Sequence, residues 1–213
     1  RSAHPAFDKA CMVMEIEIRR TPLKGFLADP EAMEAAVDEA TIMIVGSAPC
    51  FPFGLIDPIG ALGALAERRC LWLHVDACVG GYIAPFVRMN GGDVPPFDFA
   101  VPGVSSMSAD LHKYGYCAKG ASTVFFRTEA LRSHMPFTVS DWPAGKMTTP
   151  TLAGTRPGGA IAAAWAVMNH LGVDGYRRKH GMVTAAREQI EAGVRARGFE
   201  VIGAPQLGIV AFT

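Results

Sequence analysis

The sequence predicts an α/β fold in which a mostly parallel central sheet is covered by helices. Two observations lead to this class. Short, largely apolar runs at residues 41–45 and 71–75 have the composition of strands that are buried on both faces. A helical stretch at residues 58–69 lies between them, which is the arrangement of a strand–helix–strand unit with parallel strands.

The amino-terminal third contributes three further predicted elements. A short helix is expected at residues 7–12. At residues 14–18, apolar and charged residues alternate, which indicates a half-buried strand. Asp29 has the character of an N-cap and Pro30 suits a first helical position, so a helix should run from there to about residue 40.

The rest of the chain continues the alternation of strands and helices. A strand should end near Met107. The segment at residues 133–157 is rich in Pro and Gly and lacks periodicity. Residues 159–171 are apolar nearly all round, which predicts a deeply buried helix. The remaining expected elements are a strand at 124–127, an amphipathic helix at 174–197, and strands at 200–202 and 207–212.

We predict two domains, a cofactor-binding large domain at residues 1–172 and the start of a smaller carboxyl-terminal domain at residues 173–213. The first residue is Arg1, and the last residues lie within a predicted strand. We therefore expect the chain to be part of a longer protein, with further segments of both domains outside it.

Composition narrows the function. Lys plus Arg and Asp plus Glu number 20 each, so the chain lacks the excess of positive charge that would indicate nucleic acid as a partner. The five cysteines form no CxxC pair and indicate reduced thiols in a cytoplasmic protein. Gly and Pro interrupt the apolar run at residues 42–56, so it does not have the pattern of a membrane span, although an anchor upstream stays open.

Three predicted strand ends carry reactive residue types. Ser47 ends the first apolar run, Asp76 ends the second, and Lys113 lies in a loop after the third. In parallel sheets, ligands bind beyond the carboxyl ends of the strands. A Schiff-base lysine and an aspartate on the ring nitrogen are the groups that pyridoxal phosphate needs, and small, apolar neighbours of Lys113 should favour its neutral amine.

Other interpretations of the same residues stay open at this point. The Lys113 loop could be structural, with its ammonium in solvent. His74 alternates with Asp76 and is more typical of a satisfied core histidine. His74, Asp76 and Cys78 could be metal ligands, but a supporting ligand set is missing, so we expect no metal.

The chain resembles the pyridoxal-phosphate-dependent group II decarboxylase superfamily, and within it the sphingosine-1-phosphate lyases most. The resemblance covers nearly the whole chain. The matching segments are SAHPAFDKA (residues 2–10), GSAPCFPFGLIDPI (46–59), LHVDACVGG (73–81), SADLHKYGYCAKG (108–120) and DWPAGKMTTPTLAGTRPGG (141–159).

The resemblance implies a role for each matching residue. Lys113 would hold pyridoxal 5'-phosphate as a Schiff base, Asp76 would hold the pyridinium nitrogen, and His4 would lie against the ring. Cofactor contacts are also implied for Ser47, Ala77, His112 and Thr155, the last at the phosphate and from a partner subunit. Lys119 would meet the phosphate of the substrate.

The same resemblance implies the large-domain fold of the aspartate-aminotransferase-like (type I) class, a homodimer with shared active sites, and a function. That function is cleavage of sphingosine 1-phosphate or a similar phosphorylated long-chain amino alcohol to a fatty aldehyde and phosphoethanolamine. Two alternatives remain: an amino-acid decarboxylase with the same cofactor, and a non-catalytic or truncated dimerisation module. The apolar residues at 51–53 could receive a lipid tail or simply pack in the core.

Overall fold

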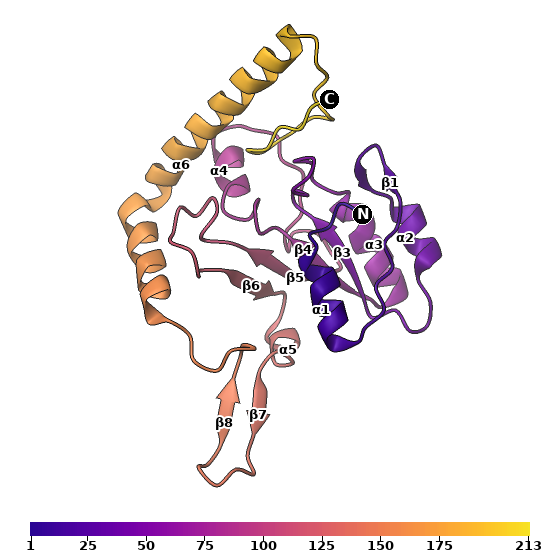
Figure 1. Ribbon diagram of the computed structural model, residues 1–213, viewed down its shortest axis with the longest axis vertical. Coiled ribbons are helices and arrows are strands. Elements are labelled where there is room, and N and C mark those ends of the chain that lie inside the picture. Colours follow the sequence, from indigo (N-terminus) through magenta and orange to yellow (C-terminus); the bar gives the residue numbers. More distant parts are fainter.

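A four-stranded sheet organises the molecule. The computed structural model describes all 213 residues. The strand order is β3 (Met43–Ser47), β4 (Trp72–Asp76), β5 (Val104–Ala109) and β6 (Thr123–Phe126) (Figure 1). The first three strands are parallel and β6 is antiparallel to β5. The predicted α/β class with a mostly parallel sheet is therefore confirmed.

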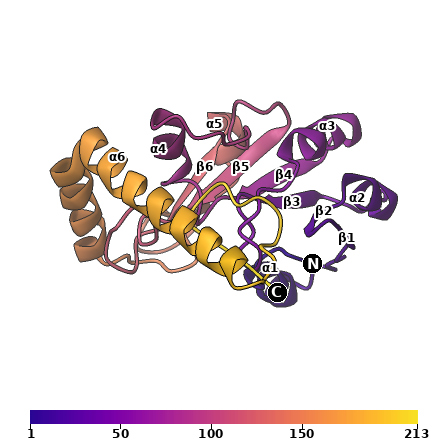
Figure 2. The ribbon, with the colours of Figure 1, turned by 90° about the horizontal axis from the view of Figure 1, so that it is seen from above.

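Helices connect the parallel strands. Strand β3 is followed by α3 (Ile59–Arg69), and β4 by α4 (Ala84–Met89). Seen from above, α3 and α4 lie on one side of the sheet and α1 (Ala6–Met14) on the other (Figure 2). Three shorter elements complete this part of the chain: α2 (Pro30–Ala36), begun by Asp29, whose side chain accepts the Glu31 N–H, and the paired strands β1 (Leu23–Lys24) and β2 (Leu27–Ala28).

The main hydrophobic core lies between the sheet and α3. Leu73 and Val75 of β4 pack with Leu62 and Leu65 of α3, and none of these side chains is more than 1% exposed. Each fully buried side chain of this size stabilises the fold by about 1.5–3 kcal/mol. The alternate residues of β4, His74 and Asp76, project to the opposite face, where α1 lies. This alternation separates the packing side of the strand from the side available for chemistry.

The carboxyl ends of the strands are held level with one another. Ser47 pairs with Asp76 in the β3–β4 register, and Asp76 pairs with Ser108 in the β4–β5 register. Beyond β3, the Ala48 N–H donates to the Asp76 carbonyl at 2.8 Å. At Gly80 an added Cβ would collide with the Ala48 carbonyl, so glycine lets the turn after β4 approach the turn after β3.

A long helix, α6 (Gly158–Ala196), crosses the outside of the molecule and breaks at Gly172, where φ is 56° and ψ is −176°. Its second half is fixed by aromatic packing, since Tyr176 and His180 stack on Phe86 of α4. His180 has no exposed surface, and burial lowers its pKa to about 4, so the ring is neutral. The break coincides with the predicted domain boundary, and the division into domains stays a prediction.

Four sequence predictions about local structure are wrong. Residues 14–18 form no strand: Met14 is the last residue of α1, and no neighbouring strand offers backbone partners to the residues after it. Met14, Ile16 and Ile18 instead help to line an apolar cavity of about 500 Å³. Helix α2 ends at Ala36 rather than near 40, since Val37 is extended. The predicted strands near the carboxyl end reduce to one bridge between Val201 and Phe212.

The fourth wrong prediction concerns the apolar helix. The first half of α6 was expected to be deeply buried, yet Ile161 is 61% and Trp165 is 69% exposed, because no other element of this chain covers them. The Pro- and Gly-rich segment before it also has structure that its composition did not indicate. It follows the short helix α5 (Glu129–Arg132) and contains a hairpin of β7 (Phe137–Val139) and β8 (Met147–Thr149) that projects from the molecule (Figure 1). None of the helices has the length and apolar character required to cross a membrane.

Candidate active site

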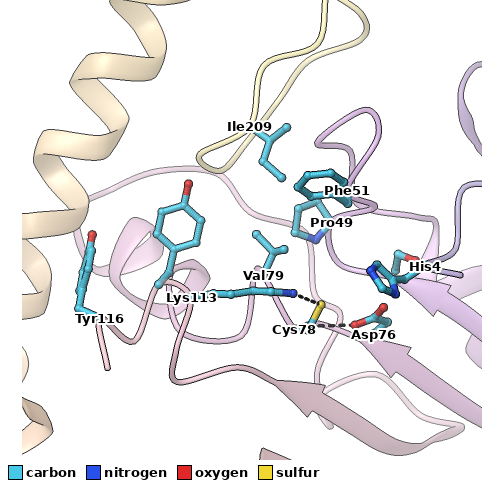
Figure 3. A pocket seen from close by; sticks show the side chains of 11 residues that line it. His4, Pro49, Phe51, Asp76, Cys78, Val79, Lys113, Tyr116 and Ile209 are labelled. Atoms are coloured by element: carbon cyan, nitrogen blue, oxygen red, sulfur yellow. Dashed lines mark hydrogen bonds between the residues drawn. The ribbon is translucent and has the colours of Figure 1, made fainter. Parts of the chain in front are cut away.

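A cavity of about 470 Å³ lies beyond the carboxyl ends of the parallel strands (Figure 3). It contains four of the predicted site residues, which come from four separate segments of the chain. Its lining residues are His4, Ser47, Pro49, Phe51, Asp76, Cys78, Val79, Lys113, Tyr114, Tyr116 and Ile209. Polar groups therefore gather on one part of a mostly apolar wall, which is the usual character of a small-molecule site.

Asp76 is the last residue of β4 and is only 8% exposed. Its Oδ1 accepts the Cys78 N–H and the Ser108 hydroxyl, each at 3.1 Å. Its Oδ2 accepts no hydrogen bond from the protein. A buried carboxylate is costly unless it is paired. Asp76 is thus fixed through one oxygen and keeps the other as an open acceptor in a residue that lines the cavity.

Lys113 lies in the loop between β5 and β6. The loop is held by backbone hydrogen bonds, among them the His112 N–H to the Ala121 carbonyl at 3.1 Å and the Asp110 N–H to the Cys78 carbonyl at 3.1 Å. The Lys113 Nζ lies 2.8 Å from the Cys78 Sγ and 3.0 Å from the Asp110 Oδ2. Figure 3 shows its side chain extended along the cavity toward Cys78 and Asp76.

The charge state of Lys113 corrects the sequence argument. Burial does lower the pKa of this amine, as expected, but the contacts with Cys78 and Asp110 raise it, and the net pKa lies above the ordinary lysine value. In the form without a bound carbonyl group, the lysine is therefore an ammonium. The pKa of the Cys78 thiol is raised as well: burial and the nearby Asp76 bring it to about 11, so Cys78 stays a thiol.

His4 precedes α1 and is exposed at the rim of the cavity. Its Nδ1 accepts the Ala6 N–H at 3.1 Å, which satisfies one of the free donors at the start of α1. In a neutral ring the proton then lies on Nε2. His4 therefore caps the start of α1, and this contact orients its ring beside the cavity.

Ser47 and Ala77 differ in position. Ser47 lines the cavity, and its N–H donates to the Oδ2 of Asp57 at 2.8 Å. Ala77 is fully buried and does not line the cavity, so its cofactor contact stays a prediction. Sequence reasoning missed Asp57, whose Oδ1 also accepts the Ala28 N–H at 2.8 Å. Its signal was a carboxylate that follows an apolar run, as at Asp76.

Three other predicted residues lie outside the cavity. His112 places its Nδ1 2.6 Å from the Ala121 carbonyl and its Nε2 3.5 Å from the Asp110 Oδ2, a position suited to orienting the lysine loop. Thr155 and Lys119 are exposed. Neither residue lines the cavity, so their expected phosphate contacts stay predictions.

The apolar wall includes residues to which the sequence gave no role. Tyr114 and Tyr116 line the cavity, and the Tyr114 hydroxyl donates to the Gly208 carbonyl at 3.1 Å, which brings Ile209 to the same wall. Of the two phenylalanines considered for a lipid tail, Phe51 lines the cavity, whereas Phe53 packs on the ring of Phe26. No local sequence pattern marks these positions, because their neighbours are distant in the sequence.

His74 has the structural role favoured by the sequence. Its Nδ1 lies 2.8 Å from the Ser106 Oγ, and its ring packs edge-on against Phe7 of α1. Burial lowers its pKa, so the ring is neutral. The histidine is therefore satisfied within the sheet, and the three-residue metal site considered above has no further ligand in the structure.

A parallel sheet that places an amine and an open carboxylate oxygen at one cavity defines a domain of the pyridoxal-dependent class. Comparisons with known proteins agree. Residues 1–213 match the family described as the pyridoxal-dependent decarboxylase conserved domain, and the chain belongs to this family.

Several proteins similar to this chain are sphingosine-1-phosphate lyases. It is 47% identical to a sphingosine-1-phosphate lyase of Oryza sativa subsp. japonica and 46% identical to one of Arabidopsis thaliana, in each case over 99% of this chain. A solved sphingosine-1-phosphate lyase of Burkholderia pseudomallei superposes with a TM-score of 0.96 at 42% identity, covering all of this chain. The chain spans 40% of the rice protein, 39% of the Arabidopsis protein and 49% of the bacterial one.

The cofactor of this family is pyridoxal phosphate, and the residues present fit it. The Lys113 Nζ can bond to a carbonyl carbon, and the open Asp76 Oδ2 can accept a hydrogen bond from a protonated ring nitrogen. The apolar walls suit an aromatic ring, and the volume of about 470 Å³ leaves room for a substrate beside it. Thr155, the residue expected at the cofactor phosphate, does not line this cavity.

Proposed function

We propose that the protein containing this chain is a pyridoxal-phosphate-dependent carbon–carbon lyase. Its substrate would be sphingosine 1-phosphate or a similar phosphorylated long-chain amino alcohol, and its products a fatty aldehyde and phosphoethanolamine. The observation that carries the proposal is the placement of Lys113 and Asp76 at one cavity in a chain whose relatives named above are sphingosine-1-phosphate lyases.

The residues of the chain divide the work between them. Lys113 would bind the cofactor through its Nζ and yield that place to the amine of the substrate. Bound there, pyridoxal phosphate supplies a ring that takes up the electrons released when a bond at the substrate alpha carbon breaks. Asp76 would accept a hydrogen bond from the protonated ring nitrogen at Oδ2. The hydrogen bonds that Cys78 and Ser108 donate to Oδ1 keep the carboxylate in place. His4 would lie against the ring face.

The apolar wall would receive the hydrocarbon part of the substrate. Phe51 and Ile209 come from different loops, and both line the cavity together with Val79 (Figure 3). An alkyl chain placed there leaves water at about 0.8 kcal/mol per buried CH₂ group, and it would also exclude water from the reacting carbons. Lys119 would contact the substrate phosphate in the assembled protein.

The competing function is decarboxylation of an amino acid, which the family description favours. The complete protein should be offered sphingosine 1-phosphate and, separately, a panel of amino acids, with aldehyde and carbon dioxide measured in each case. We expect aldehyde from the phosphorylated amino alcohol in stoichiometric yield with phosphoethanolamine. Carbon dioxide from an amino acid without aldehyde from the lipid would replace the lyase proposal with the decarboxylase.

We further propose that the protein is a homodimer with shared active sites. Ile161, Trp165 and Met168 are spaced to lie on one face of α6, and all three are exposed. Leu152, near Thr155 in the segment that leads to α6, is fully exposed as well. Apolar side chains gathered on one surface are typical of an interface between subunits. A partner's copy of this segment could then supply Thr155 to the site.

Equilibrium sedimentation of the complete protein should give the mass of a dimer. Trp165→Glu should weaken association by at least about tenfold, because it buries a charge in the proposed interface. Met12→Glu, at an exposed apolar position of α1, is the matched control and should leave the mass unchanged. A monomer that retains full activity would contradict the shared site.

A further inference from the structure

Asp110 is a buried carboxylate beside the site lysine to which the proposed chemistry assigns no role. It is 9% exposed and is contacted from three sides. The Ser122 hydroxyl donates to its Oδ1, the Lys113 Nζ lies 3.0 Å from its Oδ2, and the His112 Nε2 lies 3.5 Å from the same oxygen. Its backbone N–H is bonded to the Cys78 carbonyl. The carboxylate is therefore fixed in both position and orientation.

Lys113 must exist in two states if it has the role proposed above. Bonded to a carbonyl group it is not a free amine, but each substrate that displaces it releases an amine into a partly buried cavity. An ammonium in such a cavity is poorly solvated. Without a nearby negative partner, this desolvation cost would oppose the displacement of the lysine from the carbonyl group. Asp110 lies three residues before Lys113 in the same loop and does not line the cavity. It can therefore bind the ammonium without occupying the space needed by a ligand.

We propose that Asp110 is a positioning residue whose carboxylate receives the Lys113 ammonium whenever the lysine is not bonded to a carbonyl group. The inference rests on the proposed role of Lys113. It gives the loop a second function besides presenting the amine: the released lysine is kept at the wall of the cavity, within reach of the reacting carbons but away from the place of the incoming amine.

Several other titratable groups face the same amine or carboxylate. Cys78 contacts the Nζ through its thiol, and His112 contacts Asp110. Asp76, His4, Tyr114 and Tyr116 line the cavity. Among these groups, only Asp110 forms an ion pair with Lys113. Because this contact and that with Cys78 outweigh the effect of burial, the pKa of Lys113 is raised. Removing the charge of Asp110 takes away one of these two contacts and should therefore lower that pKa.

The test uses the complete protein without cofactor and without substrate. Reductive methylation with ¹³C-formaldehyde labels the lysines, Lys113→Ala identifies the Lys113 signal, and its chemical shift is followed against pH. In the wild-type protein the Lys113 pKa should lie above 10.5, the ordinary lysine value. In Asp110→Asn it should fall below the wild-type value, and the rate of reaction with pyridoxal phosphate at fixed pH below 9 should rise about tenfold per unit of that fall.

Matched variants separate position from charge. Asp110→Glu keeps the carboxylate and should retain a raised pKa. Asp98→Asn removes a carboxylate from a remote ion pair with Arg88 and should leave the Lys113 signal unchanged. A wild-type pKa below 10.5 would overturn the proposal, even if Asp110→Asn fails to fold. So would an unchanged pKa in a folded Asp110→Asn protein. Since no activity is measured, a failed lyase assay and a failed Asp110 test remain distinguishable.

Discussion

Replacement of Lys113 by alanine should abolish the near-visible absorption band that the complete protein gains with pyridoxal phosphate. It should also lower turnover by a factor of about 10³ or more, since a covalent step is lost. The physical reason is that Lys113 is the one lysine among the lining residues of the cavity. No other primary amine of a side chain is placed to bond a carbonyl group there.

The measurement is a spectroscopic titration with cofactor, followed by an assay with sphingosine 1-phosphate. Lys24→Ala is the control, because Lys24 is exposed and pairs only loosely with Glu31 at 3.8 Å. It should retain both the band and the turnover. A band that survives in Lys113→Ala would show that another amine, and not Lys113, is bonded to the cofactor. No band in any of the three proteins would favour the third reading of the sequence, a non-catalytic dimerisation module.

The sequence was sufficient to predict the parts of the fold that depend on local pattern. The runs around β3 and β4 are apolar because Ile44, Leu73 and Val75 are buried in the core, and such runs can be recognised without knowing the neighbours. The reactive residues at their ends followed from the rule that parallel strands finish at one edge. Ser47 and Asp76 do lie side by side in the register of the sheet.

Properties that depend on distant parts of the chain could not be predicted in this way. The alternation at residues 14–18 requires a partner strand that this chain does not provide. The first half of α6 is apolar, but whether it packs inside its own chain or against another is not encoded in its periodicity. The charge of Lys113 depends on the side chains of Asp110 and Cys78, and the latter reaches it from a different strand.

The cavity wall shows the same limit at the level of single residues. Ile209 lines the site beside a hydrogen bond that the Tyr114 hydroxyl donates to the Gly208 carbonyl, across 94 positions of sequence. Tyr116 adopts a φ of 58°, which is uncommon for a residue other than glycine. It is accommodated by stacking against His180 and Tyr176. Substrate choice depends on such contacts, so the sequence alone identifies the chemistry better than the shape of the substrate.

Asp76→Asn should reduce turnover by about 10² to 10³ while the cofactor band remains. A single preorganised charge at a reacting centre typically contributes this much. The amide has nearly the shape of the carboxylate and can still accept from Cys78 and Ser108, so the loop stays in place. It carries no negative charge, however, and cannot hold the proton of the ring nitrogen. Turnover at saturating substrate and the band should therefore respond differently.

Asp57→Asn provides the matched comparison, because Asp57 is a second buried carboxylate near the same edge of the sheet. Both of its oxygens accept backbone N–H groups, from Ala28 and Ser47, and it does not line the cavity. An amide can accept only one of them, so we expect a loss of about 1–3 kcal/mol in the free energy of unfolding with little change in turnover. If Asp76→Asn instead lowers the free energy of unfolding and leaves turnover unchanged, the carboxylate of Asp76 is structural like that of Asp57. The cavity would then not be the catalytic site.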